Sequence, residues 1–467
     1  MTQFILNNTE IKINLSPGIT MLDFVRYHQH LTGTKIGCRE GDCGACSVLV
    51  GTLIGDTVRY HSVTSCLMPI GNAHGKHIVT IEGINLEKLN LVQESFVNHG
   101  ATQCGFCTPG FIVSLTGFCL DEAPPSYESA IDSLNGNICR CTGYKSIEKA
   151  AMSVNEKLQE RNLADPIHYA VKNNIVPDYF LTIPDRIKKI EKNENVVSHN
   201  KKVAGGTDLY VQQHDTIVNE TIDFLLDQHY LKGIHQQGDY CEMGGSTTVS
   251  EMAISPIFLN SFKNLKKYIK LISSTPIRNM ATVAGNFTNA SPIGDLTIIF
   301  LSLDAQLFLG DESGKREIPL RQFYKGYKQI DKNSNEIIEK IKFHLPVNSV
   351  LFNFEKVSKR THLDIASVNS AITLQMDAGT IIAAGLSAGG VGPIPMYLSK
   401  SSAFLCNKIV SESLVNELIM IAQDEVSPIS DARGTEIYKR MLLSQIIKAH
   451  FIELFPQLDS KKILNIL

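Results

Sequence analysis

Cysteine is the residue type with the clearest chemical potential in this sequence, and it is unevenly distributed. Nine of the eleven cysteines fall before residue 142, and eight of these form two tight groups. In a reducing compartment such a density seldom means disulfides, and metal or redox ligation is the more common use. The two groups are therefore the first candidates for a functional site.

The first group consists of Cys38, Cys43, Cys46 and the more distant Cys66. This C-x4-C-x2-C pattern with a separate fourth cysteine is the plant-type [2Fe–2S] spacing. Four thiolates must surround a compact diiron core, and the glycines of the loop GCREGDCGAC let backbone amides approach the sulfides. Zinc is the alternative, but zinc sites usually contain C-x2-C pairs. The spacing favours an iron–sulfur cluster.

The second group pairs Cys104-x2-Cys107 with Cys139-x-Cys141. A C-x2-C pair alone suits a zinc ribbon or a redox dithiol equally well, whereas a C-x-C second half is unusual for zinc. Each pair precedes a predicted helix, whose N-terminal N–H groups and positive dipole end suit an anionic thiolate cluster. The pattern favours a second [2Fe–2S] centre. The other cysteines, Cys119, Cys241 and Cys406, are isolated, and we expect them to be packing residues.

The elements that would position these cysteines form two predicted domains. Strands are expected at 3–6, 11–15, 47–50, 57–63 and 76–84, with a short helix capped by Thr20. This order predicts a β-grasp domain over residues 1–84. From 85 to 160 the apolar spacing becomes helical, with helices in LVQESFVNHG, PGFIVSLTGFCL and SIEKAAMSVNEKL, which predicts an all-helical domain.

The remainder of the chain predicts a multidomain α+β protein. Residues 161–178 show little pattern and are expected to form a linker. Residues 179–345 mix short strands and helices around two glycine-rich loops, and residues 346–467 place strands before two long helices. We expect a two-part α+β domain followed by a C-terminal α+β domain.

The two glycine loops lie in the 179–345 region. The stretch Lys202, Val203 and AGGTDL, which ends at Leu209, could present successive amides to a pyrophosphate, although taken alone this loop is better explained as a plain strand-end turn. The second loop, TPIRNMATVAGNFTNASPIGD, supplies small residues, amide donors and one carboxylate suited to ribose hydroxyls. No G-x-G-x-x-G motif stands at a strand–helix turn, so a Rossmann site is not predicted.

Three of these motifs carry a family resemblance. GCREGDCGACSV, QCGFCTPGF and NICRCTGY closely resemble the two iron–sulfur domains of the xanthine dehydrogenase/aldehyde oxidase family of molybdenum hydroxylases. The glycine loops resemble the FAD domain of that family and of its carbon monoxide dehydrogenase-type relatives. KVSKRTHLDIASVN, AGLSAGGVGPIP and SPISDARGTEIYKR resemble the flavoprotein C-terminal domain.

The resemblance assigns roles to individual residues. The 104/107/139/141 cluster would lie next to a molybdopterin held by a partner, with Gln103 near the pterin, and the 38/43/46/66 cluster would face the flavin. Tyr327 and Asp364 occupy positions that the family places on the nicotinamide side, whereas Arg433 and Arg440 are expected to form structural ion pairs. The expected FAD contacts are Lys202, Val203, Ala204, Gly205, Gly206, Thr207, Asp208, Leu209, Ile272, Thr282, Gly285, Asn286, Ser291, Asp295, Ile338 and Lys356.

The resemblance also implies a division of labour between chains. The sequence ends at Leu467, where single-chain relatives continue into a molybdopterin domain, so we expect no catalytic residue for hydroxylation in this chain. A larger molybdopterin-binding subunit would supply it, in a heterotetramer of two copies of each. Electrons from xanthine, oxidised to urate there, would pass through two [2Fe–2S] clusters to FAD and on to NAD+.

The xanthine type is favoured because carbon monoxide dehydrogenase-type relatives usually carry the iron–sulfur and FAD domains on separate chains. Other interpretations remain open. The same subunit type could serve an aldehyde, nicotinate or an aromatic acyl-CoA, or the chain could be a stand-alone diaphorase. A protein with zinc in both cysteine sites is the alternative from a different class, and it leaves the FAD-like loops unexplained.

Composition excludes several other classes. The formal net charge of −3 gives no basic surface suited to nucleic acid. The most apolar window, from Leu296 to Leu309, contains Asp304 and is too short to cross a bilayer. The N-terminus alternates apolar and polar residues without a basic leader, so a cytoplasmic location is expected.

Overall fold

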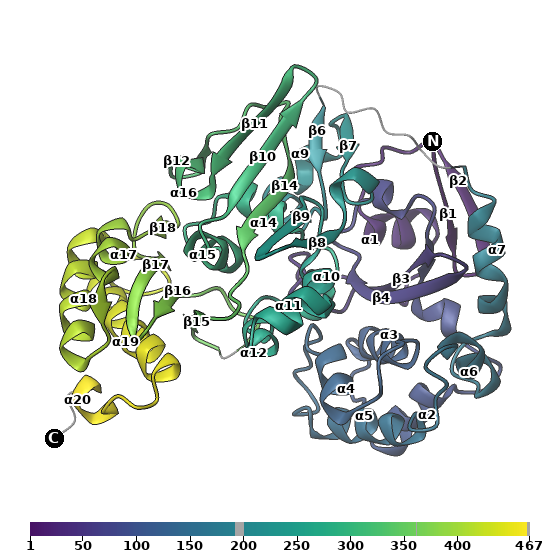
Figure 1. Ribbon diagram of the computed structural model, residues 1–467. Coiled ribbons are helices and arrows are strands. Elements are labelled where there is room, and N and C mark those ends of the chain that lie inside the picture. Colours follow the sequence, from purple (N-terminus) through teal and green to yellow (C-terminus); the bar gives the residue numbers. More distant parts are fainter. Residues whose placement is uncertain (192–199, 361, 465–467) are drawn as a thin grey trace. The chain divides into compact units, whose positions relative to one another are not determined.

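The computed structural model describes residues 1–191, 200–360 and 362–464 (Figure 1). The described residues form two compact units, each built from two stretches of chain. The first unit combines 1–226 with 274–281, and the second combines 227–273 with the residues from 282 onward. Each predicted iron–sulfur domain lies wholly in the first unit, whereas the predicted 179–345 domain contributes to both.

The first unit opens with the expected β-grasp sheet, of strand order β2-β1-β5-β3-β4. β1 pairs in parallel with β5, and the other neighbours are antiparallel. The elements of this part are β1 (Thr2–Leu6), β2 (Thr9–Ile13), α1 (Met21–Asp23), η1 (Phe24–His28), β3 (Ser47–Ile54), β4 (Thr57–Thr64), η2 (Ile70–Ala73), β5 (His77–Val79) and η3 (Ile81–Ile84).

Both faces of this sheet are covered, which explains the apolar run from Val48 to Val50 in β3. Val48 and Val50 pack on the side of α1, and Leu49 between them packs against the helices on the other side. Successive strand side chains point to opposite faces, so a strand buried on both sides has no polar alternation. Two expectations need correction. The strand expected over 76–84 ends at Val79 and continues as the short helix η3, and the helix after Thr20 changes to a π-helical turn at Phe24.

The helical part of the first unit follows and shares a core with one face of the sheet. The stretch 161–178, expected to be a linker, contains helix α6 and buries Ile175 and Val176 in that core. A helix of seven residues makes about two turns, too few for its periodicity to stand out. The elements are α2 (Leu91–Asn98), α3 (Thr108–Cys119), α4 (Tyr127–Ser133), α5 (Lys145–Lys157), α6 (Pro166–Lys172), η4 (Asp178–Thr182), α7 (Ile183–Lys188), β6 (Lys201–Val203), α8 (Leu209–Gln212), α9 (His214–Ile217), β7 (Ile222–Phe224) and α13 (Thr275–Arg278).

The second unit contains two larger antiparallel sheets. One has the order β11-β10-β14-β9-β8, and the other has the order β15-β16-β17-β18, with β19 also on β17. Figure 1 shows α17, α18 and α19 gathered beside the second sheet, and their apolar residues share its core.

The second unit's N-terminal elements are η5 (His229–Leu231), β8 (Ile234–Gln237), β9 (Tyr240–Gly244), α10 (Val249–Ile254), α11 (Pro256–Ser261), α12 (Leu265–Lys270), α14 (Val283–Asn289), α15 (Asp295–Ser302), β10 (Gln306–Asp311), β11 (Gly314–Pro319), α16 (Leu320–Phe323), β12 (Tyr324–Gly326), β13 (Gln329–Ile330) and β14 (Ile337–His344). Its C-terminal elements are β15 (Val350–Val357), β16 (Val368–Asp377), β17 (Thr380–Gly389), β18 (Met396–Tyr397), α17 (Ser399–Leu405), β19 (Lys408–Ile409), α18 (Glu412–Glu425), α19 (Glu436–Leu454) and α20 (Ser460–Leu464).

The apolar window noted in the sequence becomes helix α15 and the start of β10. α15 is buried from Leu296 to Ser302 because it packs against both sheets. The Ser387 hydroxyl of the second sheet donates to the carbonyl of Ile298 at 2.6 Å, and Phe300 contacts Phe343 of β14 in the other sheet. Across the described ranges, no helix has the length and apolar character needed to span a bilayer.

Candidate functional site

The first cysteine group forms two thiol pairs in the first unit. Cys38 and Cys43 hydrogen-bond to each other within the loop that leads to β3, and Cys46 pairs with Cys66, which follows β4. Cys46 and Cys66 are buried, at 3% and 2% exposure. The loop therefore brings together all four predicted ligands, although they lie in two segments of the sequence.

One thiol of each pair is predisposed to ionise. The hydrogen bond from Cys43 lowers the pKa of Cys38 to about 5, helped by backbone amides and opposed by burial. The same bond raises the pKa of Cys43. The bond with Cys66 likewise lowers the pKa of Cys46. A metal ion binds the thiolate form of cysteine, and the positive charge of the bound ion deprotonates further thiols. Each pair is therefore suited to bind a metal ion.

The second group shows the same arrangement near the protein surface. The Sγ atoms of Cys104 and Cys141 lie 3.5 Å apart and both residues are exposed, whereas Cys107 pairs with Cys139. Burial raises the pKa of Cys139, but hydrogen bonds from the Thr142 hydroxyl and amide outweigh it, so this pKa is lowered. Cys107 occupies the N-cap position of α3. The Cys104-x2-Cys107 pair thus precedes a helix, as the sequence predicts.

A two-plus-two arrangement suits a diiron cluster. Each iron of a [2Fe–2S] centre takes two protein thiolates, and tetrahedral bonds of about 2.3 Å place two sulfurs on one metal roughly 3.7 Å apart. The 3.5 Å separation of Cys104 and Cys141 is close to this value. The thiols therefore fit the iron–sulfur clusters that their spacing predicts.

The two cysteine loops touch each other. The side-chain amide of Asn137 donates to the carbonyl of Gly44 at 3.0 Å and to the Ser47 hydroxyl at 3.3 Å. A Cβ on Gly44 would lie 2.3 Å from the carbonyl oxygen of Gly136, so the approach requires glycine. The segment that leads into Cys139 is thus packed directly on the loop of the first group.

The first glycine loop, from Ala204 to Asp208, lies between β6 and α8 in the same unit. A Cβ on Gly205 would meet the carbonyl of Met280 at 1.9 Å, and Gly206 has φ +81° with Leu67 beside it. No hydrogen bond to the amides of Gly205, Gly206 or Thr207 forms within the part of the chain that the structure describes. Such available amides suit a phosphate group.

The neighbours of this loop connect it to the first cysteine group. The side-chain amide of Asn72 donates to the carbonyl of Ala204 at 2.8 Å, and Leu67, beside Gly206, directly follows Cys66. Lys202 is committed elsewhere, because its amine lies 2.6 Å from the Asp223 carboxylate and its side chain is 12% exposed.

The second glycine region is divided between the units, and its part from Thr282 onward belongs to the second unit. Thr282 caps α14 and accepts from the amide of Gly285 at 3.1 Å. The amides of Val283 and Ala284 are bonded to the backbone before α10, so none of the first three amides of α14 is available for a ligand. The Asn286 side-chain oxygen accepts from Thr297.

Asp295, the predicted ribose-binding carboxylate, is held by two buried partners. The amine of Lys356 lies 2.6 Å from one carboxylate oxygen, and the side-chain amide of Asn369 donates to the other at 2.6 Å. Lys356 also donates to the carbonyl of Leu271 at 2.7 Å, and its side chain is only 2% exposed. The structure thus unites two predicted FAD residues in one ion pair and makes Lys356 a support for Asp295.

The remaining predicted flavin residues of the second unit occupy varied positions. Ile272 and Ile338 are buried, at 6% and 4% exposure, after α12 and within β14 respectively. The hydroxyl of Ser291 accepts from the amide of Ile293 at 3.4 Å. These positions give no ligand contact by themselves.

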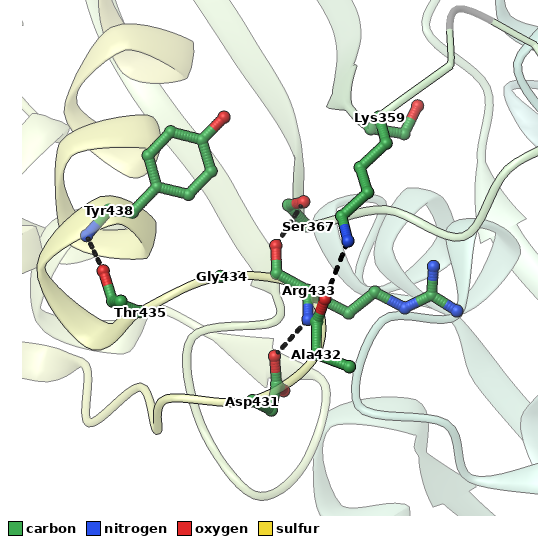
Figure 2. A pocket seen from close by; sticks show the side chains of 9 residues that line it. Lys359, Ser367, Asp431, Ala432, Arg433, Gly434, Thr435 and Tyr438 are labelled. Carbon is green, nitrogen blue, oxygen red and sulfur yellow. Dashed lines mark hydrogen bonds between the residues drawn. The ribbon is translucent and has the colours of Figure 1, made fainter.

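A cavity of about 350 Å³ lies at the start of α19 (Figure 2). The Lys359 amine donates to the carbonyl of Ala432 at its edge, and the guanidinium of Arg433 lies 3.5 Å from Asp364, the predicted nicotinamide-side carboxylate. Tyr327, the other predicted residue on that side, is 64% exposed between β12 and β13. The cavity is lined by Ser358, Lys359, Ser367, Asp431, Ala432, Arg433, Gly434, Thr435 and Tyr438.

The ion pairs expected for Arg433 and Arg440 are confirmed, with Asp364 and Glu436 as partners. Three supporting residues were not predicted, namely Asn72, Asn137 and Asn369. Asn137 lies within the motif NICRCTGY and Asn369 within KVSKRTHLDIASVN. The supporting role of an asparagine cannot be predicted from its motif before the residues that contact it in the fold are known. Thr361 of the latter motif lies outside the described residues.

Comparison with family models gives the domain identities. The 2Fe-2S iron-sulfur cluster binding domain matches residues 4–70 and the [2Fe-2S] binding domain matches 80–152. The FAD binding domain in molybdopterin dehydrogenase matches 180–347, and the CO dehydrogenase flavoprotein C-terminal domain matches 354–454. The chain has the iron–sulfur and flavin domain architecture of molybdenum hydroxylases. The predicted fold class is therefore confirmed.

Curated relatives of this architecture are much longer proteins. The chain is 26% identical to xanthine dehydrogenase of Emericella nidulans, over 98% of this chain and 39% of that protein. It is 27% identical to xanthine dehydrogenase 1 of Arabidopsis thaliana, over 92% of this chain and 38% of that protein. It is 24% identical to aldehyde oxidase 1 of Rattus norvegicus, over 96% of this chain and 39% of that protein. The chain thus spans about two-fifths of the length of these relatives.

Solved structures share the fold over about half of the chain. Carbon monoxide dehydrogenase from Hydrogenophaga pseudoflava aligns with a TM-score of 0.52 at 22% identity, over 56% of this chain and 90% of that one. Quinoline 2-oxidoreductase from Pseudomonas putida 86 aligns with a TM-score of 0.50 at 20% identity, over 56% of this chain and 90% of that one. At these identities the likeness establishes the fold.

Proposed function

We propose that this chain is the electron-transfer subunit of a xanthine dehydrogenase-type molybdenum hydroxylase. It would take electrons from a larger molybdopterin-binding subunit and deliver them, through two [2Fe–2S] clusters and FAD, to NAD+. The observation that carries the proposal is the pairing of four thiols in each of two touching loops, one of which also adjoins the glycine loop through Leu67. When bound, clusters supply one-electron transfer and FAD supplies the conversion to hydride transfer.

The eight cysteines would hold the clusters, with the pairs Cys38–Cys43 and Cys46–Cys66 on the two irons of the first. In the second cluster, the pairs would be Cys104–Cys141 and Cys107–Cys139. The exposure of Cys104 and Cys141 supports an approach of the partner's molybdopterin from this side. Gln103, exposed beside Cys104, would face the pterin.

The available amides of Gly205, Gly206 and Thr207 suit the pyrophosphate of FAD. Asp295 suits a ribose hydroxyl. Lys356 and Asn369 would hold the Asp295 carboxylate in position. The NAD+ side is proposed at Asp364 and the adjoining cavity, where Lys359 and Arg433 supply positive charge for phosphate groups.

The first test is the composition of the purified chain. We expect a visible spectrum of flavin and iron–sulfur centres, with about four irons, four sulfides and one FAD per chain. Zinc is assayed on the same sample. A colourless protein with about two zincs and no flavin would contradict the relay and support the zinc-bound alternative.

The substrate and the partner need a second experiment. The chain is co-expressed with a candidate molybdopterin subunit, and reduction of NAD+ is followed with xanthine, an aldehyde, nicotinate or quinoline. Relatives named xanthine dehydrogenase support xanthine, while those named aldehyde oxidase and quinoline 2-oxidoreductase support the alternative substrate classes. Reduction with xanthine alone supports the proposal. NADH oxidation by the isolated chain with dyes, and no complex with any such subunit, supports a stand-alone diaphorase.

A further inference from the structure

Arg39 directly follows the first ligand, Cys38, and has an unusual backbone. Its φ is +58°, in the left-handed region that residues with side chains disfavour. The guanidinium lies 2.7 Å from one carboxylate oxygen of Asp23 and 3.2 Å from the other, a two-pronged ion pair. A conformation of this kind persists when its surroundings hold it in place.

Asp23 is itself fixed in position. Thr20 caps α1, its hydroxyl accepting from the Asp23 amide and donating to the carboxylate at 2.8 Å. Burial raises the pKa of Asp23, but hydrogen bonds from Arg39 and Thr20 outweigh it, so the pKa is lowered. The carboxylate is therefore charged at neutral pH, and the ion pair is anchored on a helix.

The second contact of Arg39 reaches another part of the same unit. Its guanidinium lies 3.4 Å from Nε2 of His214, the first residue of α9. α9 follows α8, which begins at Leu209, where the first glycine loop ends. One side chain thus joins the loop of the first cysteine group to the helices that follow the loop proposed to bind FAD.

We propose that Arg39 is a positioning residue for electron transfer at the first cluster, holding the Cys38–Cys43 loop through Asp23 and His214. This inference rests on the proposed function. The amide of Glu40 donates to the sulfur of Cys38 at 3.3 Å, and the amide of Cys38 to the sulfur of Cys43 at 3.4 Å. Such N–H groups stabilise the added negative charge of a reduced cluster, so a looser loop lowers its reduction potential.

The test measures the potential of the first cluster in the full chain by EPR-monitored redox titration, with Cys141→Ser identifying the signal of the second cluster. Arg39→Gly removes the ion pair while glycine accepts the left-handed backbone. Asp23→Asn removes the anchor and leaves the cluster loop's own residues intact. We expect each variant to shift the reduction equilibrium about tenfold toward the oxidised cluster, a fall of about 59 mV for one electron.

The sign of the Asp23→Asn shift separates positioning from charge. Loss of a negative charge alone raises the potential, whereas a loosened loop lowers it. Asp56→Asn is the matched control, because Asp56 is an exposed partner of Lys188 in the same unit and its loss changes the net charge equally. We expect that control to leave the potential unchanged.

The measured potentials decide the inference. A fall in both variants, with the control unchanged, supports it. A rise in Asp23→Asn, or an unchanged potential in both variants, overturns it while the proposed function stands. If Arg39→Gly retains little iron, the potential of Asp23→Asn alone decides: a fall supports the inference, and a rise or no change overturns it. A wild-type chain without iron–sulfur signals would instead contradict the proposed function itself.

Discussion

The backbone amide of Ile138 donates a hydrogen bond to the carbonyl oxygen of Cys43 at 3.0 Å. Cys43 belongs to the first cysteine group, and Ile138 directly precedes Cys139 of the second. One peptide hydrogen bond therefore joins the ligand segments of the two groups. In the proposed relay, this contact and the neighbouring side chain of Asn137 keep the two clusters at a fixed separation.

Asn137→Ala tests the importance of this junction. The buried amide loses its bonds to Gly44 and Ser47, so the free energy of unfolding should fall by about 1–3 kcal/mol. We also expect slower electron exchange between the clusters, followed by stopped-flow absorbance. Asn173→Ala is the control, because Asn173 is exposed and its side chain makes one bond, to the carbonyl of Tyr169. Equal effects in both variants would argue against a special role for the junction.

Single ligand variants should remove one cluster at a time. Cys66→Ser should disrupt the first cluster and Cys141→Ser the second, each leaving about two irons of the expected four. Iron and sulfide assays measure the loss, and EPR identifies the cluster that remains. Cys406→Ser should retain both clusters, because Cys406 lies outside the two groups, its thiol donating to the carbonyl of Ser402. Loss of all iron from either ligand variant would show that the clusters do not assemble independently.

The cysteine sites could be predicted from the sequence because their chemistry is local. Three ligands of the first group lie within one loop, and the two pairs of the second group precede α3 and α5, so spacing alone indicates the donor set. The helix α6 was missed in the expected linker because it is short and held by the core residues Ile175 and Val176. Its stability depends on tertiary contacts that a sequence pattern does not contain.

The supports of the predicted flavin residues were harder to foresee. Asp295, Lys356 and Asn369 are far apart in sequence and meet only because α15, β15 and β16 pack together in the second unit. The resemblance indicated Asp295 and Lys356 as two separate ligand contacts. The structure shows them as one buried ion pair, a relationship that follows from the fold rather than from any spacing.

Gly205→Ala tests the first glycine loop. A Cβ at this position would lie 1.9 Å from the carbonyl oxygen of Met280, a backbone atom that cannot move aside easily. The loop must therefore shift, and we expect the purified variant to retain much less FAD than the wild type. Flavin fluorescence after denaturation measures the retained amount. Gly326→Ala is the control, since its Cβ would meet only the side chain of Gln329 at 3.1 Å. Full FAD retention by Gly205→Ala would contradict a phosphate-binding role for the loop.

Asp295→Asn should destabilise the second unit by leaving the buried Lys356 amine without its anion. Removing one partner of a buried ion pair typically costs about 3–5 kcal/mol of unfolding free energy. The matched variant Asp295→Asn/Lys356→Met removes both charges and should recover part of this loss. Chemical denaturation measures stability, and FAD titration measures affinity. We expect weak FAD binding in both variants, because neither retains the carboxylate. Normal affinity in the double variant would mean that Asp295 does not contact the flavin nucleotide.

Acid sensitivity should arise in part from His77, which is fully buried in the first unit. Its Nε2 lies 2.8 Å from the carbonyl of Asn7 and its Nδ1 lies 2.7 Å from the Tyr60 hydroxyl. A carbonyl only accepts, so Nε2 carries the proton and Nδ1 accepts from Tyr60. Burial lowers the pKa of His77 from 6.5 to about 3, so the folded chain holds this imidazole neutral.

The sign of the pH dependence follows from this shift. Between pH 6.5 and about 3, the unfolded chain binds a proton at His77 that the folded chain does not. Stability should therefore fall as the pH falls below 6.5, by up to about 1.4 kcal/mol per pH unit. Urea unfolding from about pH 7.5 to about pH 5 should show a weaker decline for His77→Gln. Exposed His99→Gln should keep the wild-type slope, and an unchanged slope in His77→Gln would exclude His77 as a source of the acid sensitivity.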